Sequence, residues 1–185
     1  MTRAQLPNAI TVSRMVMALP LLWLLTTAQY RHALVLALVA GATDVVDGFL
    51  AKRYGWQSVL GGILDPIADK LLLSVCFLGL WGSGQLPTWL VATIVLRDLV
   101  VAIGAFAFWK ATGVLKPAPT GISKAATLSQ LLLVALMMAH LAGLDLLQRW
   151  VPPLMLAAAA ATVLSGVDYV VTYSLRAWRA HRGKR

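Results

Sequence analysis

The sequence predicts an all-α integral membrane protein with six transmembrane helices in one bundle. Of the 185 residues, 59% are hydrophobic and 12% are charged, which is too apolar for an ordinary soluble domain. The apolar residues form six runs, each near the length of about 20 residues that crosses a hydrocarbon core of about 30 Å. The links between the runs are short and contain Gly or Pro, so we expect a single domain over residues 1–185.

The expected helices follow one another with little chain between them. Residues 1–8 are polar and contain Pro7, which predicts an interfacial segment ahead of the first helix. A signal peptide is the alternative for this start, but Arg14 interrupts its apolar region. The helices are expected at about residues 9–28, 32–53, 64–81, 86–109, 122–144 and 151–178, and residues 179–185 form a basic cytoplasmic tail.

Lysine and arginine are distributed unequally between the two sides of the membrane. One side receives Arg3, Lys52, Arg53, Lys110, Lys116, Arg176, Arg179, Arg182, Lys184 and Arg185, and the other receives Arg31 and Arg149. Because cytoplasmic loops carry the excess of basic residues, this distribution places both termini in the cytoplasm. The net charge of +9 therefore indicates a membrane anchor rather than a nucleic-acid partner. Short termini without a transit segment favour a bacterial inner membrane.

Four of the seven acidic residues lie within residues 44–69, at the cytoplasmic end of the second expected helix and the start of the third. They are Asp44, Asp47, Asp65 and Asp69. The first pair is spaced i, i+3 and the second i, i+4, so each pair shares one face of its helix. The short link predicts that the two helices are antiparallel neighbours. The four carboxylates are then expected to converge on one pocket open to the cytoplasm.

Carboxylate oxygens in this number point to a metal site. Hard oxygen ligands suit Mg²⁺, Mn²⁺ or Ca²⁺, and four carboxylates are enough for two ions that share ligands. Gly48 and Gly61 let a bulky ligand such as a nucleotide approach the backbone. Two alternatives remain: the aspartates pair with Arg or Lys in the bundle, or they line the path of a small cation transporter. Transport does not require the glycine spacing, and no paired broken half-helices are visible.

The same residues carry a family resemblance. Asp44, Asp47, Gly48, Ala51, Gly61, Asp65 and Asp69 match the pattern D-x2-D-G-x2-A-R-x8-G-x3-D-x3-D of the CDP-alcohol phosphatidyltransferases at every spacing. The chain therefore resembles this family, with one departure at Lys52, where the pattern has Arg. Lysine keeps the charge but loses the planar fork for a bidentate phosphate contact. Arg53 beside it is either a substitute for that arginine or a charge that follows the membrane orientation.

The resemblance implies a six-helix enzyme, usually a homodimer, that takes CDP-diacylglycerol and an alcohol and releases CMP. It implies two Mg²⁺ or Mn²⁺ ions held by the four aspartates, with Asp69 also the base that removes the proton of the acceptor hydroxyl. Gly48, Ala51, Lys52 and Gly61 would then line the site of the CDP-lipid. The active site would face the cytoplasm.

Residues 6–136 resemble the cardiolipin synthase branch more than others, through LPNAITVSR, LPTWLVATIVLRDLVVAIGAF and LKPAPTGISKAATLSQLLLV. Phosphatidylglycerol is the expected acceptor, with glycerol 3-phosphate as the alternative. Arg97 and Lys124 lie where desolvation is unfavourable, so each needs an anion, and together with Arg53 they are candidates for the acceptor phosphate. For Arg97 the alternative is a salt bridge to a motif aspartate, Asp98 or Asp168. For Lys124 it is an ammonium group that reaches the interface.

Asn8, Thr11 and Arg14 share one helical face at i, i+3, i+6 spacing. Two roles are open for this face: contact with the nucleotide diphosphate, or support of a metal ligand. Asn8 and Thr11 are therefore candidates for the CDP-lipid site. Capping of the first helix is the alternative for Asn8.

Overall fold

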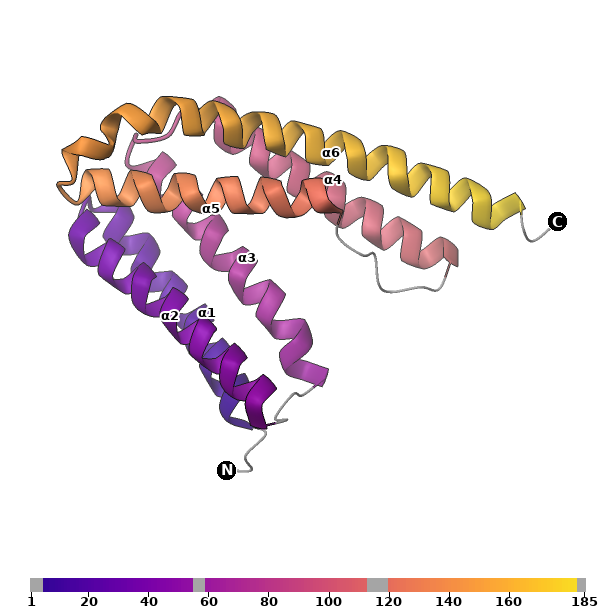
Figure 1. Ribbon diagram of the computed structural model, residues 1–185, viewed down its shortest axis with the longest axis horizontal. Coiled ribbons are helices and arrows are strands. Elements are labelled where there is room, and N and C mark those ends of the chain that lie inside the picture. Colours follow the sequence, from indigo (N-terminus) through magenta and orange to yellow (C-terminus); the bar gives the residue numbers. More distant parts are fainter. Residues whose placement is uncertain (1–4, 55–58, 113–119, 183–185) are drawn as a thin grey trace. The chain divides into compact units, whose positions relative to one another are not determined.

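A computed structural model describes residues 5–54, 59–112 and 120–182 of the chain, and Figure 1 traces its helices. Within these ranges, the side chains of residues 5–10, 47–52, 59–63, 108, 111–112 and 173–182 lie outside the description. The described residues are helical almost throughout, which confirms the predicted all-α class.

Within the described ranges, six α-helices follow the order expected from the sequence. They are α1 (Gln5–Thr26), α2 (Tyr30–Tyr54), α3 (Val59–Gly82), α4 (Thr88–Thr112), α5 (Gly121–Leu141) and α6 (Val151–Arg182). A short 3-10 helix, η1 (Asp145–Trp150), precedes α6. Gly84 and Gly143 have φ of 74° and 111° after α3 and α5, a conformation that glycine adopts without strain. The glycines in these links therefore end the helices, as the sequence indicated.

The helices are arranged in two compact units. The first contains residues 1–86 and 134–148, and the second contains residues 87–133 and 149–185, so α5 contributes to both. Whether the chain behaves as the single predicted domain stays a prediction.

In the first unit, α1 packs against both α2 and α3. The two helices α1 and α3 approach closely at Gly79, where a Cβ atom would lie 2.7 Å from Cβ of Leu25. The sequence predicted a direct α2–α3 pair, but among the described residues α2 and α3 each contact α1 instead. The physical reason is that α1 carries polar side chains that bind the carboxylates of both neighbours.

In the second unit, α4 packs against α6. Gly104 of α4 provides the close approach, because a Cβ atom there would lie 2.7 Å from Cε1 of Tyr169. A small residue on one helix thus receives an aromatic ring from the other. This unit also holds the polar network of Arg97, described below.

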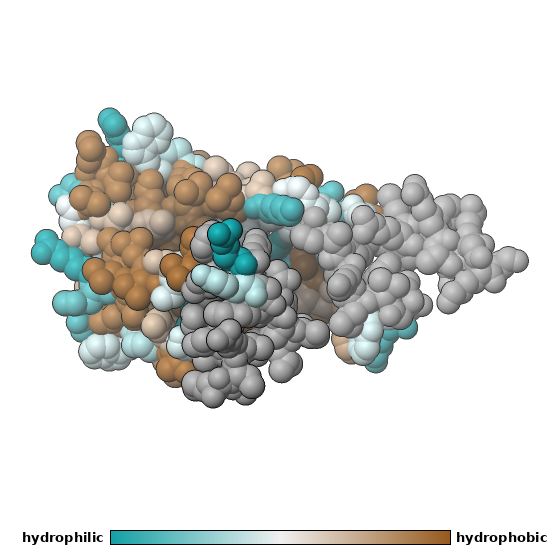
Figure 2. Space-filling view, turned by 60° about the horizontal axis from the view of Figure 1, so that its bottom comes forward, coloured by the Kyte–Doolittle hydropathy of each residue, from teal (hydrophilic) through white to brown (hydrophobic). Residues whose placement is uncertain are grey.

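Large apolar side chains are exposed along all six helices, and brown, hydrophobic residues cover much of the described face in Figure 2. Among the described residues, three segments are long and apolar enough to cross a membrane: Thr88–Ala107, Gly121–Leu141 and Asp145–Thr172. The first helix contributes a shorter apolar segment, Thr11–Thr26. The α1 segment is shorter than a full span, and charged residues interrupt α2 and the start of α3. Membrane crossing by these three helices therefore stays a prediction, as do six crossings and cytoplasmic termini.

Candidate active site

A buried arginine joins two of the four predicted metal ligands. Arg14 of α1 is 1% exposed, and its Nη1 atom donates to Oδ1 of Asp69 on α3 at 2.7 Å. The same Nη1 atom also forms an ion pair with Oδ1 of Asp44 on α2. The two carboxylate side chains remain 42% and 56% exposed. Carboxylates from two helices therefore meet at a single cationic nitrogen, with part of each group open to a reactant.

The third predicted ligand is held one turn away on the same helix pair. The hydroxyl of Thr11 donates to Oδ1 of Asp65 at 2.6 Å, and Thr11 is 1% exposed. Thr11 and Arg14 are three residues apart on α1, and Asp65 and Asp69 are four apart on α3. Two facing turns of α1 and α3 are thus joined by two polar contacts. This geometry agrees with the second of the two roles open for the Asn8–Thr11–Arg14 face, the support of a carboxylate.

Several predicted site residues lie where the structure gives no side-chain geometry. Asp47, Gly48, Ala51 and Lys52 are in α2, Gly61 is in α3 and Asn8 is in α1, all outside the described side chains. Their proposed roles are therefore expectations from the sequence.

The donor set near Arg14 fits a hard divalent cation. Mg²⁺ and Mn²⁺ take carboxylate and hydroxyl oxygens, which are the atoms that Asp44, Asp65, Asp69 and Thr11 supply. Within the described side chains, no three His, Cys, Asp or Glu residues form a ready metal-binding group. Each of these contacts uses Oδ1, and a carboxylate has about four lone-pair sites on two oxygens, so acceptor capacity remains on all three aspartates.

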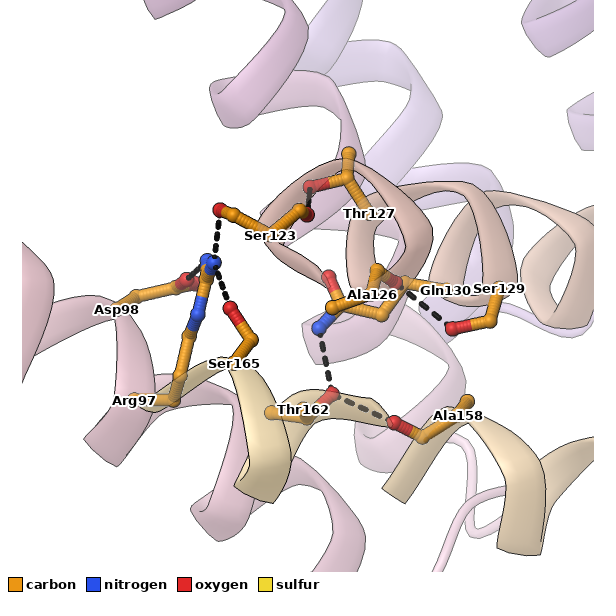
Figure 3. A network of polar contacts seen from close by, with 10 residues as sticks. All are labelled: Arg97, Asp98, Ser123, Ala126, Thr127, Ser129, Gln130, Ala158, Thr162 and Ser165. Carbon is orange, nitrogen blue, oxygen red and sulfur yellow. Dashed lines mark hydrogen bonds and ion pairs between the residues drawn. The ribbon is translucent and has the colours of Figure 1, made fainter. Parts of the chain in front are cut away.

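A second polar cluster surrounds Arg97 in the other unit (Figure 3). Arg97 of α4 is 9% exposed, and its Nη2 atom donates to the hydroxyls of Ser123 on α5 and Ser165 on α6, both at 2.6 Å. Its Nη1 atom donates to Oδ1 of Asp98 at 3.1 Å. Arg97 thus ties three helices together. The pairing with Asp98 is one of the alternatives that the sequence left open.

The network continues along α5 and α6 through uncharged groups. Nε2 of Gln130 donates to the hydroxyl of Thr162 at 2.9 Å, and that hydroxyl donates to the carbonyl of Ala158 at 2.6 Å. Gln130 and Thr162 are fully buried. Helices in an apolar environment associate through such contacts and through close packing, so this pair helps to fix the register of α5 and α6.

The other two candidates for the acceptor phosphate are on the surface. Arg53 near the end of α2 and Lys124 in the first turn of α5 are both exposed. Water can solvate an exposed charge, so neither residue needs an anion from the protein. Their exposure agrees with the alternatives from the sequence: a charge that follows the membrane orientation for Arg53, and an ammonium group that reaches the interface for Lys124.

Sequence reasoning missed the two serine partners of Arg97 and the central position of Arg14. Ser123 and Ser165 carry no pattern of their own, because isolated serines are frequent at helix contacts in membranes. For Arg14 a signal was present: a charged residue inside an apolar helix requires an anion. The four nearby aspartates were the available anions.

Comparisons with known proteins place these residues in context. A family model described as CDP-alcohol phosphatidyltransferase matches residues 4–171. A probable phosphatidylglycerophosphate synthase of Mycobacterium tuberculosis is 35% identical over 90% of this chain and 80% of its own length. A chloroplastic CDP-diacylglycerol–glycerol-3-phosphate 3-phosphatidyltransferase of rice is 32% identical over 91% of this chain. The human cardiolipin synthase (CMP-forming) is 34% identical over 70% of this chain.

The matched relatives differ in how much of their length this chain represents. The match covers 56% of the rice protein and 48% of the human protein, so the chain spans about half of these two. The mycobacterial protein is similar over most of both chains.

Proposed function

Because the chain belongs to the CDP-alcohol phosphatidyltransferase family, we propose that it transfers a phosphatidyl group from CDP-diacylglycerol to a phosphate-bearing glycerol acceptor and releases CMP. The observation that carries this proposal is the meeting of Asp44 and Asp69 at one cationic nitrogen, beside Asp65. These carboxylates belong to the spacing pattern of the family. Family membership gives no support to the cation transporter alternative.

The aspartates would hold the metal that the family uses. Asp44, Asp47, Asp65 and Asp69 are the proposed ligands of Mg²⁺ or Mn²⁺, with two ions as the expected number. When bound, such a cation neutralises charge on the diphosphate and on the leaving CMP. Thr11 fixes the orientation of the Asp65 carboxylate, and Arg14 fixes those of Asp44 and Asp69.

Asp69 is the proposed general base. Its contact with Arg14 uses Oδ1, and more than half of the side chain is exposed, so the acceptor hydroxyl can reach the carboxylate. Asp69 takes the hydroxyl proton while the hydroxyl oxygen bonds to the phosphorus on the diacylglycerol side. The bond from that phosphorus to the bridging oxygen breaks, and CMP leaves with the electron pair. A base positioned in this way contributes roughly 10²–10⁴-fold to a rate.

Binding of the two substrates is assigned to the remaining sequence candidates. Asn8, Thr11, Gly48, Ala51, Lys52 and Gly61 are proposed for the CDP-lipid, and Arg53, Arg97 and Lys124 for the acceptor phosphate. Of the five N–H donors of Arg97, three hold Asp98 and two serines. The Nε donor is among those left for that role, because it donates to none of the described residues.

The acceptor is proposed to be phosphatidylglycerol, which gives cardiolipin. Glycerol 3-phosphate, which gives phosphatidylglycerophosphate, is the second candidate, and one observation favours it: relatives named for that reaction are 32% and 35% identical over about nine-tenths of the chain, whereas a cardiolipin synthase fusion protein of Schizosaccharomyces pombe that matches the same share is 30% identical. We further propose a homodimer in a bacterial inner membrane. The site is proposed to open to the cytoplasm, because the basic residues are concentrated on the side of residues 44–69.

Purified protein in phospholipid vesicles tests the proposal directly. It is given radiolabelled CDP-diacylglycerol, Mn²⁺ and one acceptor at a time: phosphatidylglycerol, glycerol 3-phosphate, inositol phosphate or serine. We expect CMP release with the first or second acceptor and the matching lipid product. Absence of CMP release with all four would refute the proposal, and Mn²⁺ flux into sealed vesicles without CMP release would favour a transporter.

A further inference from the structure

Arg14 has an unusual position for a buried cation. A single atom of its guanidinium group, Nη1, contacts carboxylate oxygens from two helices, Oδ1 of Asp44 and Oδ1 of Asp69. The arginine is 1% exposed and a guanidinium stays charged at any accessible pH, so the charge is a fixed part of the cluster. One positive group therefore holds together two negative groups that would otherwise repel each other.

The same two carboxylates are proposed ligands of the metal ion. Mg²⁺ takes oxygen ligands at about 2.0–2.1 Å, so an ion bound to the free lone pairs of these carboxylates lies close to Nη1 and shares their negative charge with it. A divalent ion beside a guanidinium is also repelled by it, and burial strengthens that repulsion. A bound metal ion therefore weakens the contact of Arg14 with the carboxylates, and that contact lowers the affinity for the metal.

We propose that Arg14 is a built-in counter-cation, which holds the Asp44 and Asp69 carboxylates in the metal-free protein and whose Nη1 contact weakens when the metal binds. The proposal rests on the proposed function, since that function supplies the reason to expect a metal here. Arg14 is thus a positioning residue. It preserves the site without metal and lowers the affinity for metal at the same time.

A purely structural salt bridge would behave differently. Loss of a structural bridge lowers stability equally with and without metal and leaves metal affinity unchanged. Loss of a counter-cation lowers stability mainly without metal, because bound metal replaces the missing charge. A variant that binds the metal more tightly is also stabilised more by it. Stability and affinity measured together therefore separate the two roles.

The experiment uses the full chain in detergent micelles without CDP-lipid or acceptor. Mn²⁺ affinity is measured from the electron paramagnetic resonance signal of free Mn²⁺, and thermal unfolding is followed in EDTA and in saturating Mn²⁺. The variants are Arg14→Gln, which removes the charge, and Arg14→Lys, which keeps it on a single nitrogen. Arg31→Gln is the control, an arginine near the start of α2 whose Nε atom donates to the carbonyl oxygen of Ala142 and which has no proposed role in the site.

We expect Arg14→Gln to bind Mn²⁺ about tenfold more tightly than the wild type, which corresponds to about 1.4 kcal/mol. Its melting temperature should fall in EDTA and recover toward the wild-type value in Mn²⁺. Arg14→Lys should bind Mn²⁺ with an affinity between the two, which keeps the test decisive if Arg14→Gln does not fold. Arg31→Gln should leave Mn²⁺ affinity unchanged and change stability equally in both conditions.

Equal or weaker Mn²⁺ binding by the Arg14 variants would overturn the inference, and so would an absence of Mn²⁺ binding by all the proteins. Because no lipid substrate is present, this result is independent of the CMP assay. A wild type that releases CMP while the Arg14 variants fail the affinity test would refute only the counter-cation. The expected affinities without CMP release would refute only the proposed reaction.

Discussion

Substitution of Gly79 by alanine tests whether close packing of α1 and α3 supports the candidate site. The new Cβ atom would lie 2.7 Å from Cβ and 2.9 Å from Cδ1 of Leu25. The Leu25 Cβ atom is fixed to the α1 backbone, so a change of side-chain rotamer cannot remove the clash and the helices must separate. Overpacking of this kind costs about 1–3 kcal/mol. Alanine regains about 0.5–1 kcal/mol over glycine within a helix.

The net expectation is a loss of about 1–2 kcal/mol, or a melting temperature lower by about 2–8 °C for a chain of this size. Thermal unfolding in detergent measures it, and Gly41→Ala in α2 is the matched control. Among the described residues, apart from the adjoining backbone of α2, no atom lies within 4 Å of a Cβ at Gly41, so this variant should be as stable as the wild type or slightly more so. CMP release should also fall in Gly79→Ala, because the same helix pair aligns Thr11 with Asp65. A Gly79→Ala protein as stable as Gly41→Ala would refute the packing argument.

Two further predictions concern single hydroxyl groups. Thr162→Val removes the acceptor of the buried Gln130 amide and should lower stability by about 0.5–2 kcal/mol in the same unfolding assay. Thr162→Ser should be near the wild type, and equal stability of the valine and serine variants would contradict this prediction. Thr11→Val removes the hydrogen bond to the Asp65 carboxylate and should lower kcat for CMP release by about tenfold, since a hydrogen bond to a charged group is worth about 1.5–3 kcal/mol. Thr11→Ser should restore most of that rate, and no rescue by serine would mean that Thr11 acts through its packing.

The sequence was sufficient to predict the helices, because each lies in a long apolar run bounded by Gly, Pro or polar residues. Helix ends differed from the predictions by a few residues, as at α1, expected from residue 9 and observed from Gln5. The polar residues at such ends have no periodic pattern that marks a boundary. Only tertiary contacts show that α1 lies against both α2 and α3.

Within the site, spacing alone predicted that Asp65 and Asp69 share a face, and both contact α1. It did not predict which cation compensates them. A metal ion and an internal arginine both compensate negative charge, so the sequence left open which of them the aspartates bind. The structure shows that Arg14 contacts Asp44 and Asp69. For Arg97 the sequence predicted a need for an anion, and the structure shows Asp98 with two serines from other helices. Contacts between distant segments depend on helix rotation, which periodicity does not fix.

The rate of CMP release by Asp69→Asn decides whether the carboxylates beside Arg14 carry out phosphatidyl transfer. The control is Asp145→Asn, which alters an aspartate that is 88% exposed and lies outside the site. With CDP-diacylglycerol, Mn²⁺ and the acceptor that works for the wild type, we predict that Asp69→Asn loses at least about 100-fold in rate. It should retain much of the cytidine nucleotide binding, and Asp145→Asn should match the wild type. Turnover of Asp69→Asn at the wild-type rate would contradict the account.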